Sequence, residues 1–287
     1  MSVSSWRPWA RRFSLVVAAG VLSACSVVGL LYQQAPRLAS TWLNDQVQLS
    51  DSQRDWLNPA LDDWLDWHRQ NILPTWLATG RDWAQQAQRD WTSDEVCAAL
   101  QGLRDQAKAT LDHSLPMWTR LALSLSPAQQ RRLAEQRRES LNEFHADFIA
   151  APPQAVLDER LTRAVDNWER LYGDLSDAQI DWLRTRLQAS PWSPAQSWQR
   201  RRLRDQALLD LIAQLQAQGL NQAQAQTRLQ SWLDAQWSPD DPDAQARQAA
   251  FWAHTCATVA DFHRQSTPAQ RQHLADTLRG YADDLDG

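Results

Sequence analysis

The pattern of hydrophobic and polar positions predicts helices along almost the whole chain. In the last segment, apolar residues recur at the helical spacing i, i+4, i+7 and i+11: Leu274, Leu278, Tyr281 and Leu285. Val and Ile together supply only eleven residues after position 24, so few segments favour a β-strand. Helix breaks are predicted near Pro36, Pro74, Pro116, Pro152, Pro191 and Pro239. We therefore expect an all-α fold, a multi-helix bundle of about nine or ten helices joined by short turns.

Four segments carry the same helix-start motif, in which Ser or Thr is followed three residues later by Gln. The pairs are Ser50 and Gln53, Ser126 and Gln129, Ser176 and Gln179, and Thr267 and Gln270. In such a capping box the hydroxyl accepts from the backbone N–H of the Gln, whose side chain reaches back to the first residue. The starts are 76, 50 and 91 residues apart, which does not define a solenoid of fixed period. We interpret them as helix starts.

The first 24 residues have the layout of an export signal. Three arginines within residues 7–12 precede a short apolar run, which ends in Leu22-Ser23-Ala24-Cys25. This ending resembles the lipobox of bacterial lipoproteins, in which a peptidase cuts before a cysteine that carries diacylglycerol. The resemblance implies cleavage between Ala24 and Cys25 and lipidation of Cys25.

The chain accordingly divides into three parts. Residues 1–24 are the lipoprotein signal peptide, residues 25–48 the lipidated anchor with the first helical segment, and residues 49–287 a periplasmic all-helical domain. The alternative is an uncleaved transmembrane anchor, because residues 13–32 carry no charge and are long enough to cross a bilayer. In bacterial lipoproteins, an Asp directly after the lipidated cysteine resembles a retention signal for the inner membrane. In this chain Ser26 occupies that position. We therefore expect an outer-membrane lipoprotein that faces the periplasm.

Charge narrows the choice of partners. Removal of residues 1–24 deletes three arginines and no acid, so the formal net charge changes from −5 to −8. Binding to nucleic acid requires clustered basic side chains that displace counterions. We expect the membrane as a partner, through the lipid anchor, and no nucleic acid.

Two cysteines remain besides Cys25. In an oxidising periplasm Cys97 and Cys256 can form a disulfide, and closing so long a loop would contribute up to roughly 5 kcal/mol. The alternative is a pair of buried free thiols. No partner cysteine or histidine stands at ligand spacing, so we predict no metal site.

The Leu-Ser/Thr-x-x-Gln element resembles the LTxxQ motif of the periplasmic stress proteins Spy and CpxP, which are small, helical and chaperone-like. The whole chain is similar to a family of uncharacterised proteobacterial lipoproteins. The matching positions are Leu31-Tyr32, Trp42-Leu43, Trp67-His68, the Cys97 segment, Leu171-Tyr172-Gly173 and residues 270–285. The resemblance implies a fold and a location but no reaction. Spy-like proteins differ in being smaller, with a basic concave face.

Fifteen tryptophans follow residue 24, which is an unusually large number. Trp76, Trp83 and Ala87 have the spacing of a core stripe, which favours packing. The alternative is a Trp-lined groove for a glycan or lipid ligand, because exposed indole rings stack on sugars and cover apolar segments.

No catalytic motif is recognisable. The six histidines include no i, i+4 ligand pair, and the chain has no Gly-x-Ser-x-Gly elbow, phosphate loop or dinucleotide fingerprint. Acidic clusters at residues 62–66 and 283–286 lack the glycine of a calcium-binding loop and are interpreted as solvated helix faces. We therefore expect no enzyme and no cofactor, but an envelope protein that binds a protein partner or unfolded clients.

Overall fold

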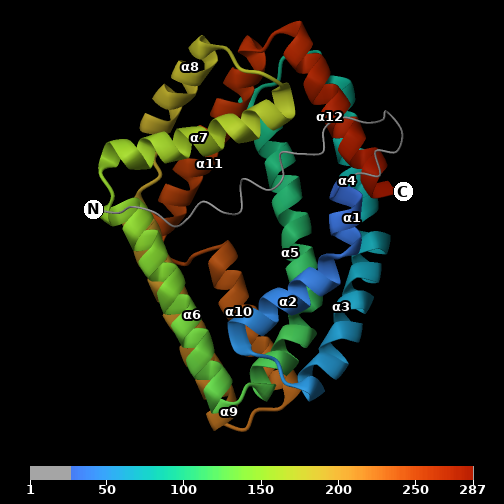
Figure 1. Cartoon of the computed structure of the whole chain (residues 1–287), viewed down its shortest axis with the longest axis vertical. Coiled ribbons are helices and arrows are strands. Elements are labelled where there is room, and N and C mark those ends of the chain that lie inside the picture. Colours follow the sequence, from blue (N-terminus) through green and yellow to red (C-terminus); the bar gives the residue numbers. More distant parts are fainter. Residues whose placement is uncertain (1–26, 287) are drawn as a thin grey trace, which may run out of the picture.

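The computed structural model describes residues 27–286, which are almost entirely helical (Figure 1). The structure is 87% helical, and the described residues contain no β-strand, which confirms the all-α prediction. The helices are α1 (Val27–Gln33), α2 (Ala35–Val47), α3 (Asp51–Asn71), α4 (Leu73–Gln86), α5 (Ser93–Ser124), α6 (Pro127–His145), α7 (Pro153–Tyr172), α8 (Asp177–Gln188), α9 (Pro194–Ala217), α10 (Gln222–Trp237), α11 (Pro242–Gln265) and α12 (Pro268–Asp286). One turn of π-helix, η1 (Ala146–Ala150), follows α6 directly.

Residues 27–286 form 12 α-helices, more than the nine or ten predicted. The breaks predicted near Pro36 and Pro74 both occur, as junctions with almost no loop between two helices. Gln34 alone separates α1 from α2, and Pro36 lies in the first turn of α2. Ile72 alone separates α3 from α4, and Pro74 lies in the first turn of α4. The backbone N–H groups of the first helical turn have no acceptor within the helix, so proline, which lacks this group, is well tolerated there. A new helix can therefore begin at proline without a separate turn segment.

The predicted break at Pro116 is wrong. Helix α5 runs from Ser93 to Ser124 and carries Pro116 inside it. A proline in a helix interior costs about 3 kcal/mol, because it removes one hydrogen bond and crowds the preceding turn. Here α5 packs against α3, α9, α10 and α11, and Gln222 Nε2 of α10 donates to the Pro116 carbonyl oxygen at 2.8 Å. The packing around α5 offsets the local cost.

The helices form an elongated frame, and α5 is its longest member (Figure 1). With 32 residues, α5 is about 48 Å long at the usual rise per residue. Helices α7, α8, α11 and α12 lie toward the upper end of the view, and α2, α9 and the start of α6 lie toward the lower end. Helix α5 therefore connects the two ends of the molecule.

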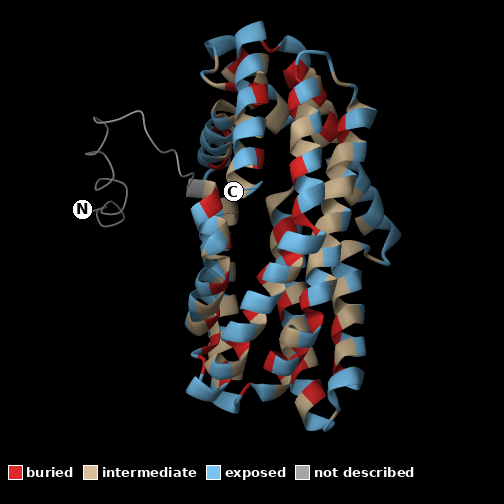
Figure 2. Ribbon diagram, turned by 90° about the vertical axis from the view of Figure 1, so that its right-hand side faces the viewer, coloured by how far each residue is buried: buried red, intermediate tan, exposed pale blue. Residues whose placement is uncertain are grey.

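Each end has its own buried apolar cluster. The lower core cluster is built from α2, α3, α5 and α9 and includes Leu57 and Leu121. The upper core cluster is built from α4, α7, α8, α11 and α12 and includes Leu183 and Phe262. Figure 2 shows that buried residues follow the inner faces of the helices, while the outer faces are exposed. Burial of these inner faces supplies the main force that holds the helices together.

Helix α1 is held by two other helices. It packs on α12, and a Cβ atom added at Gly29 would lie only 2.5 Å from the Asp284 carbonyl oxygen. Glycine is needed where two backbones approach so closely. On the other side, the Tyr32 hydroxyl and His68 Nδ1 of α3 are hydrogen-bonded at 2.7 Å. The first helical segment is therefore part of the folded body.

Candidate functional site

The predicted cleavage and lipidation residues, Ala24 and Cys25, lie outside the described residues. Helix α1 begins at Val27, two positions after Cys25. Within residues 27–286, no helix combines the length and the apolar character needed to cross a bilayer. A lipid on Cys25 would be attached within two residues of α1.

All four predicted capping boxes form, and they begin α3, α6, α8 and α12. In each box the Ser or Thr hydroxyl accepts from the Gln backbone N–H at 3.2 or 3.3 Å. The Gln Oε1 accepts from the backbone N–H of the Ser or Thr at 2.9 or 3.0 Å. Each box satisfies two backbone donors that the helix itself leaves without partners.

The boxes also meet in pairs, which sequence reasoning missed. The side-chain amides of Gln53 and Gln129 exchange hydrogen bonds of 3.2 and 2.7 Å, although the residues are 76 positions apart. Gln179 and Gln270 do the same at 2.9 and 3.0 Å across 91 positions. One pair joins α3 to α6, and the other joins α8 to α12. Each glutamine therefore caps its own helix and bridges to a second one.

A buried histidine lies near the upper glutamine pair. His263 is fully buried; its Nδ1 is 3.0 Å from the Tyr172 hydroxyl and its Nε2 is 2.9 Å from the Arg89 carbonyl oxygen. The Trp91 ring stacks on it, with ring centroids 3.8 Å apart. Because a carbonyl oxygen only accepts, Nε2 carries the proton and Tyr172 donates to Nδ1. Burial lowers the pKa of His263 and raises that of Tyr172, so both are neutral structural groups.

A disulfide joins Cys97 and Cys256, for which the sequence left open a disulfide or a pair of free thiols. The sulfur atoms of Cys97 on α5 and Cys256 on α11 are 1.97 Å apart, and their Cα atoms are 5.3 Å apart. Cys256 is buried, and Val96 and Ala260 pack in the same cluster. The bond ties α5 to α11 across 159 residues of sequence.

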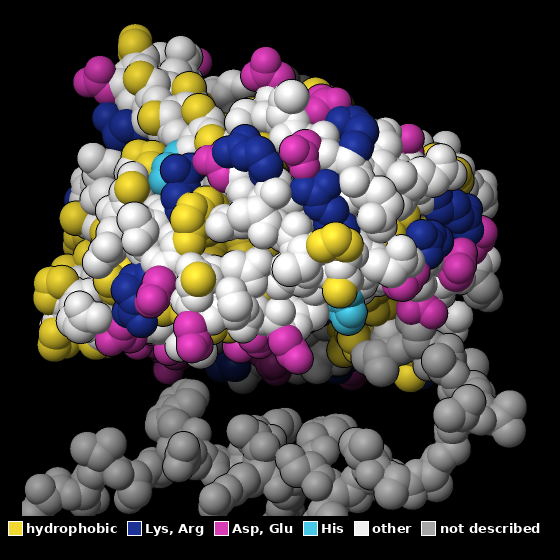
Figure 3. Space-filling model, turned by 90° about the horizontal axis from the view of Figure 1, so that it is seen from above, with side chains coloured by type: hydrophobic (Ala, Val, Ile, Leu, Met, Phe, Trp, Pro, Cys, Tyr) yellow, Lys and Arg dark blue, Asp and Glu magenta, His cyan; other side chains and the backbone are white. Residues whose placement is uncertain are grey.

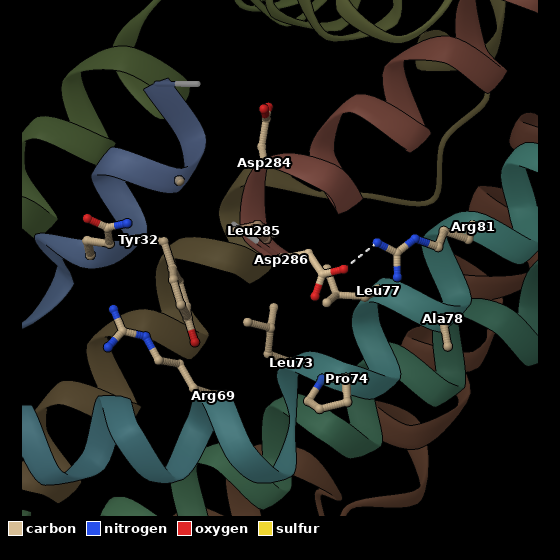
Figure 4. Close-up of a pocket in the computed structure, with 12 residues that line it drawn as sticks. Tyr32, Arg69, Leu73, Pro74, Leu77, Ala78, Arg81, Asp284, Leu285 and Asp286 are labelled. Carbon is tan, nitrogen blue, oxygen red and sulfur yellow. Dashed lines mark hydrogen bonds and ion pairs between the residues drawn. The ribbon is translucent and has the colours of Figure 1, made fainter. Parts of the chain in front are cut away.

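A pocket of about 650 Å³ lies between α1, the junction of α3 and α4, and the C-terminal end of α12 (Figure 4). We name it the anchor-side pocket, because one of its walls is the helix that follows Cys25. Its apolar surface comes from α4 and α12, through Leu73, Pro74, Leu77, Ala78 and Leu285. We call this apolar surface the floor of the pocket; it can receive a hydrophobic group.

Charged residues of both signs line the same pocket. Arg81 lies 2.7 Å from Asp286 and 3.4 Å from Asp283, and Figure 4 shows its guanidinium directed at Asp286. The guanidinium carbon of Arg69 lies 5.7 Å from the centroid of the Tyr32 ring. Both arginines thus have partners within the protein. The pocket presents balanced charges around an apolar floor.

An aromatic cluster around His68 lies beside the pocket. The rings of Trp64 and Trp76 lie 5.6 and 5.2 Å from the His68 ring, and Tyr32 is hydrogen-bonded to it. Burial lowers the pKa of His68 and raises that of Tyr32, so both groups are neutral at pH 7. The hydrogen bond between the Tyr32 hydroxyl and His68 Nδ1 joins the α1 wall of the pocket to α3.

A second pocket of about 590 Å³ lies at the upper end, beside the starts of α8 and α12. Gly173, Ser176, Thr267 and His273 are among the residues that line it. Seen from this end, Lys and Arg side chains alternate with Asp and Glu side chains (Figure 3). This surface has mixed charge and favours neither sign of ligand.

The tryptophans lie at the margins of the core. None of the fifteen described tryptophans is fully buried, and none lines either pocket. The expected core position of Trp76 is wrong, because its side chain is 36% exposed. Ala87, the third member of the predicted stripe, is buried, but the buried residues of α4 itself lie one position further round the helix, at Leu73, Leu77 and Ala84. The exposed fraction of Trp42 is larger still, at 54%.

Within the described part of the chain, no group of three or more His, Cys, Asp or Glu residues is placed to hold a metal ion. The acidic cluster at residues 283–286 is largely exposed to solvent, as the sequence suggested: the side chains of Asp283 and Asp286 are 72% and 56% exposed. Asp283 and Asp286 form ion pairs with Arg81, 202 and 205 positions away. These pairs join the end of α12 to α4.

The pocket residues could not have been grouped from local motifs, because they come from helices at opposite ends of the chain. Some signal was nevertheless present. Tyr32, His68 and Leu285 belong to segments that carry the resemblance to the lipoprotein family, and the structure brings these three segments together. Arg69 and Arg81 carried no such signal.

Comparison of the chain with models of protein families, with curated proteins and with solved structures found no match. Its class follows from its own fold: an all-α helical bundle with a surface pocket beside its first helix.

Proposed function

We propose that the chain is the precursor of a periplasmic lipoprotein, anchored through acyl chains on Cys25, whose helical domain binds another envelope protein or an unfolded client without catalysis. The lipobox and the basic, apolar and small-residue segments before it support the anchor. The anchor-side pocket is the proposed binding site.

The composition of the pocket carries the proposal for a protein ligand. An apolar floor with charges of both signs at its edge suits a hydrophobic side chain flanked by polar or charged groups, as a polypeptide provides. Burial of one large apolar side chain contributes about 1.5–3 kcal/mol, and further contacts at the edge would add specificity. Arg81 and Asp286 are already paired, so neither charge would be left without a partner when the pocket is filled.

The second candidate is a lipid or glycan ligand. A glycan would need a free aromatic face, and the one aromatic residue of the pocket, Tyr32, has Arg69 over its ring. A lipid is the better of the two, because Gly29 and Tyr32 of α1 line the pocket close to the proposed acylation site. An apolar chain would fill the same floor.

The binding site is tested by filling the pocket. Ala78 is an exposed residue of its lining, so Ala78→Trp occupies the pocket without disturbing the core. Ala223, exposed on α10, provides the matched control Ala223→Trp. In Ala78→Trp the ligand's apolar side chain loses its site in the pocket. We therefore expect an at least about tenfold reduction in one of two activities: capture of the envelope protein that the wild type captures, or suppression of client aggregation. Equal activity in both variants would refute the pocket as the protein site.

The anchor is tested separately, by the intact mass of protein extracted from membranes. We expect a chain that lacks residues 1–24 and carries acyl groups, whereas Cys25→Ala should be neither cut at that bond nor labelled with palmitate. Unchanged processing and labelling of Cys25→Ala would refute the anchor.

A further inference from the structure

We propose that α1 and α2 lie on the surface of the bilayer and hold the domain in one orientation through four exposed apolar side chains. This N-terminal apolar patch consists of Leu30, Leu31, Leu38 and Trp42. The inference rests on the proposed lipid anchor at Cys25, which it extends by a second contact with the same membrane.

The patch stands out by its concentration. Eight large hydrophobic residues are exposed in the described part of the chain, and four of them fall within residues 30–42. The other four lie singly on α4, α5, α9 and α11, where one exposed apolar side chain is ordinary. On α2, Leu38 and Trp42 are four residues apart and share one face, while Leu43 and Val47 on the opposite side are buried in the lower core cluster. Helix α2 is therefore apolar on both faces.

The patch cannot move far from the anchor. Leu30 is five positions after Cys25, which limits the distance between their Cα atoms to about 18 Å even in a fully extended chain. Helix α1 is also fixed on the body, by the close approach of Gly29 to Asp284 and by the bond from Tyr32 to His68. Figure 1 shows α1 and α2 on the side of the molecule that faces the viewer. A membrane at Cys25 would thus lie next to this side.

Charge also favours a lipid surface as the occupant. From residue 25 to residue 44 the chain has no acidic side chain, and its one charged residue is Arg37. The mature chain as a whole has an acidic balance, which would repel anionic head groups from most of its surface. Leu and Trp are the side chains that enter the boundary between head groups and acyl chains. The segment next to the anchor is therefore the part of the chain best suited to contact lipid.

The test places a fluorophore in the patch and, as a matched control, on another exposed leucine. Leu38 and Leu203 are 53% and 57% exposed, on α2 and α9. In Leu38→Cys and Leu203→Cys, only the new thiol reacts with a nitrobenzoxadiazole label, because Cys97 and Cys256 are bonded and Cys25 is acylated. The lipidated proteins are added to preformed vesicles of phosphatidylethanolamine and phosphatidylglycerol, and reduction of the label by external dithionite is followed.

We expect reduction at position 38 to be at least about tenfold slower than at position 203, the factor that corresponds to burial of one leucine side chain. Equal rates on vesicles that carry the protein would overturn the membrane contact and leave the anchor intact. Protein that fails to float with the vesicles would instead refute the anchor itself. Protection at position 38 that disappears when the protein is diluted in excess lipid would assign the patch to a second copy of the chain, and would also overturn the proposal.

Discussion

At the scale of single residues, the glutamine pairs are the feature with the clearest physical consequence. Gln179 and Gln270 are buried, and a buried amide must find partners for both its oxygen and its nitrogen. In the capping box the side-chain oxygen accepts from a backbone N–H. The side-chain nitrogen of each glutamine donates to the side-chain oxygen of the other glutamine. Four polar side chains are thereby accommodated at the helix junctions of the two core clusters.

We expect Gln179→Ala to lower the free energy of unfolding by about 1–3 kcal/mol, because it removes a cap and a buried amide partner together. Gln224→Ala is the matched control: Gln224 Oε1 caps α10 at 3.1 Å, but the residue is exposed. Loss of a cap alone should cost about 1 kcal/mol. Urea unfolding of both variants measures the difference, and equal losses would show that the pairing between helices contributes nothing.

His263 predicts a dependence of stability on pH. Burial holds its pKa below the usual 6.5, aided by the charge of Arg271 and opposed by the hydrogen bond to the Arg89 carbonyl oxygen and by the charge of Asp90. The unfolded chain therefore binds more protons than the folded one as the pH falls through 6.5, so the free energy of unfolding decreases on the acid side. Asp90 has a lowered pKa beside Arg271 and stays ionised there.

Urea unfolding between about pH 7 and pH 5 measures this slope. In His263→Gln the amide can still donate to the Arg89 carbonyl oxygen but does not titrate, so the slope should be shallower. His68 and His254, whose pKa values are also lowered by burial, account for the remainder. A slope unchanged by His263→Gln would contradict the assignment.

At the scale of elements, the position of α1 depends on one glycine. Gly29→Ala would place a Cβ atom 2.5 Å from a backbone oxygen of α12, so α1 must move. We expect a loss of about 1–3 kcal/mol in the free energy of unfolding, as for other substitutions that overfill a packed site.

Gly102→Ala, at the tenth residue of α5, provides the control. A Cβ atom there meets nothing within 4 Å, so the change should stabilise the protein by about 0.5–1 kcal/mol through the unfolded chain. Thermal or urea unfolding distinguishes the two cases. A Gly29→Ala variant as stable as the wild type would mean that α1 is not held at this contact.

Local sequence rules succeeded for helix starts and failed for some helix ends. Ser50, Ser126, Ser176 and Thr267 begin helices as predicted, because a capping box involves only neighbouring residues. Pro116 did not end α5, because contacts with four other helices outweigh a local cost. The prediction that Trp76 lies on the buried face of α4 failed for a similar reason. The face of α4 that is buried depends on how the helix packs against α3 and α12.

At the scale of the whole molecule, the disulfide connects α5, the longest helix, to α11. Reduction should lower the free energy of unfolding by about 5 kcal/mol, because a loop of 159 residues becomes free in the unfolded chain. Urea unfolding with and without reductant measures this loss. A Cys97→Ser/Cys256→Ser variant should match the reduced wild type and be insensitive to reductant; if the reduced wild type is as stable as the oxidised protein, the prediction is wrong.

The amino-acid sequence by itself determined the helical class and the four helix starts, because these depend on residue composition and on contacts within a few positions. The proposal of an export and lipidation segment rests on the sequence alone. The tertiary structure decided which starts pair through their glutamines, which face of α4 is buried, and that Tyr32, Arg69, Arg81 and Asp286 surround one pocket. These features join residues up to 205 positions apart, and their geometry is set by how the helices of residues 27–286 fill space together rather than by any local pattern.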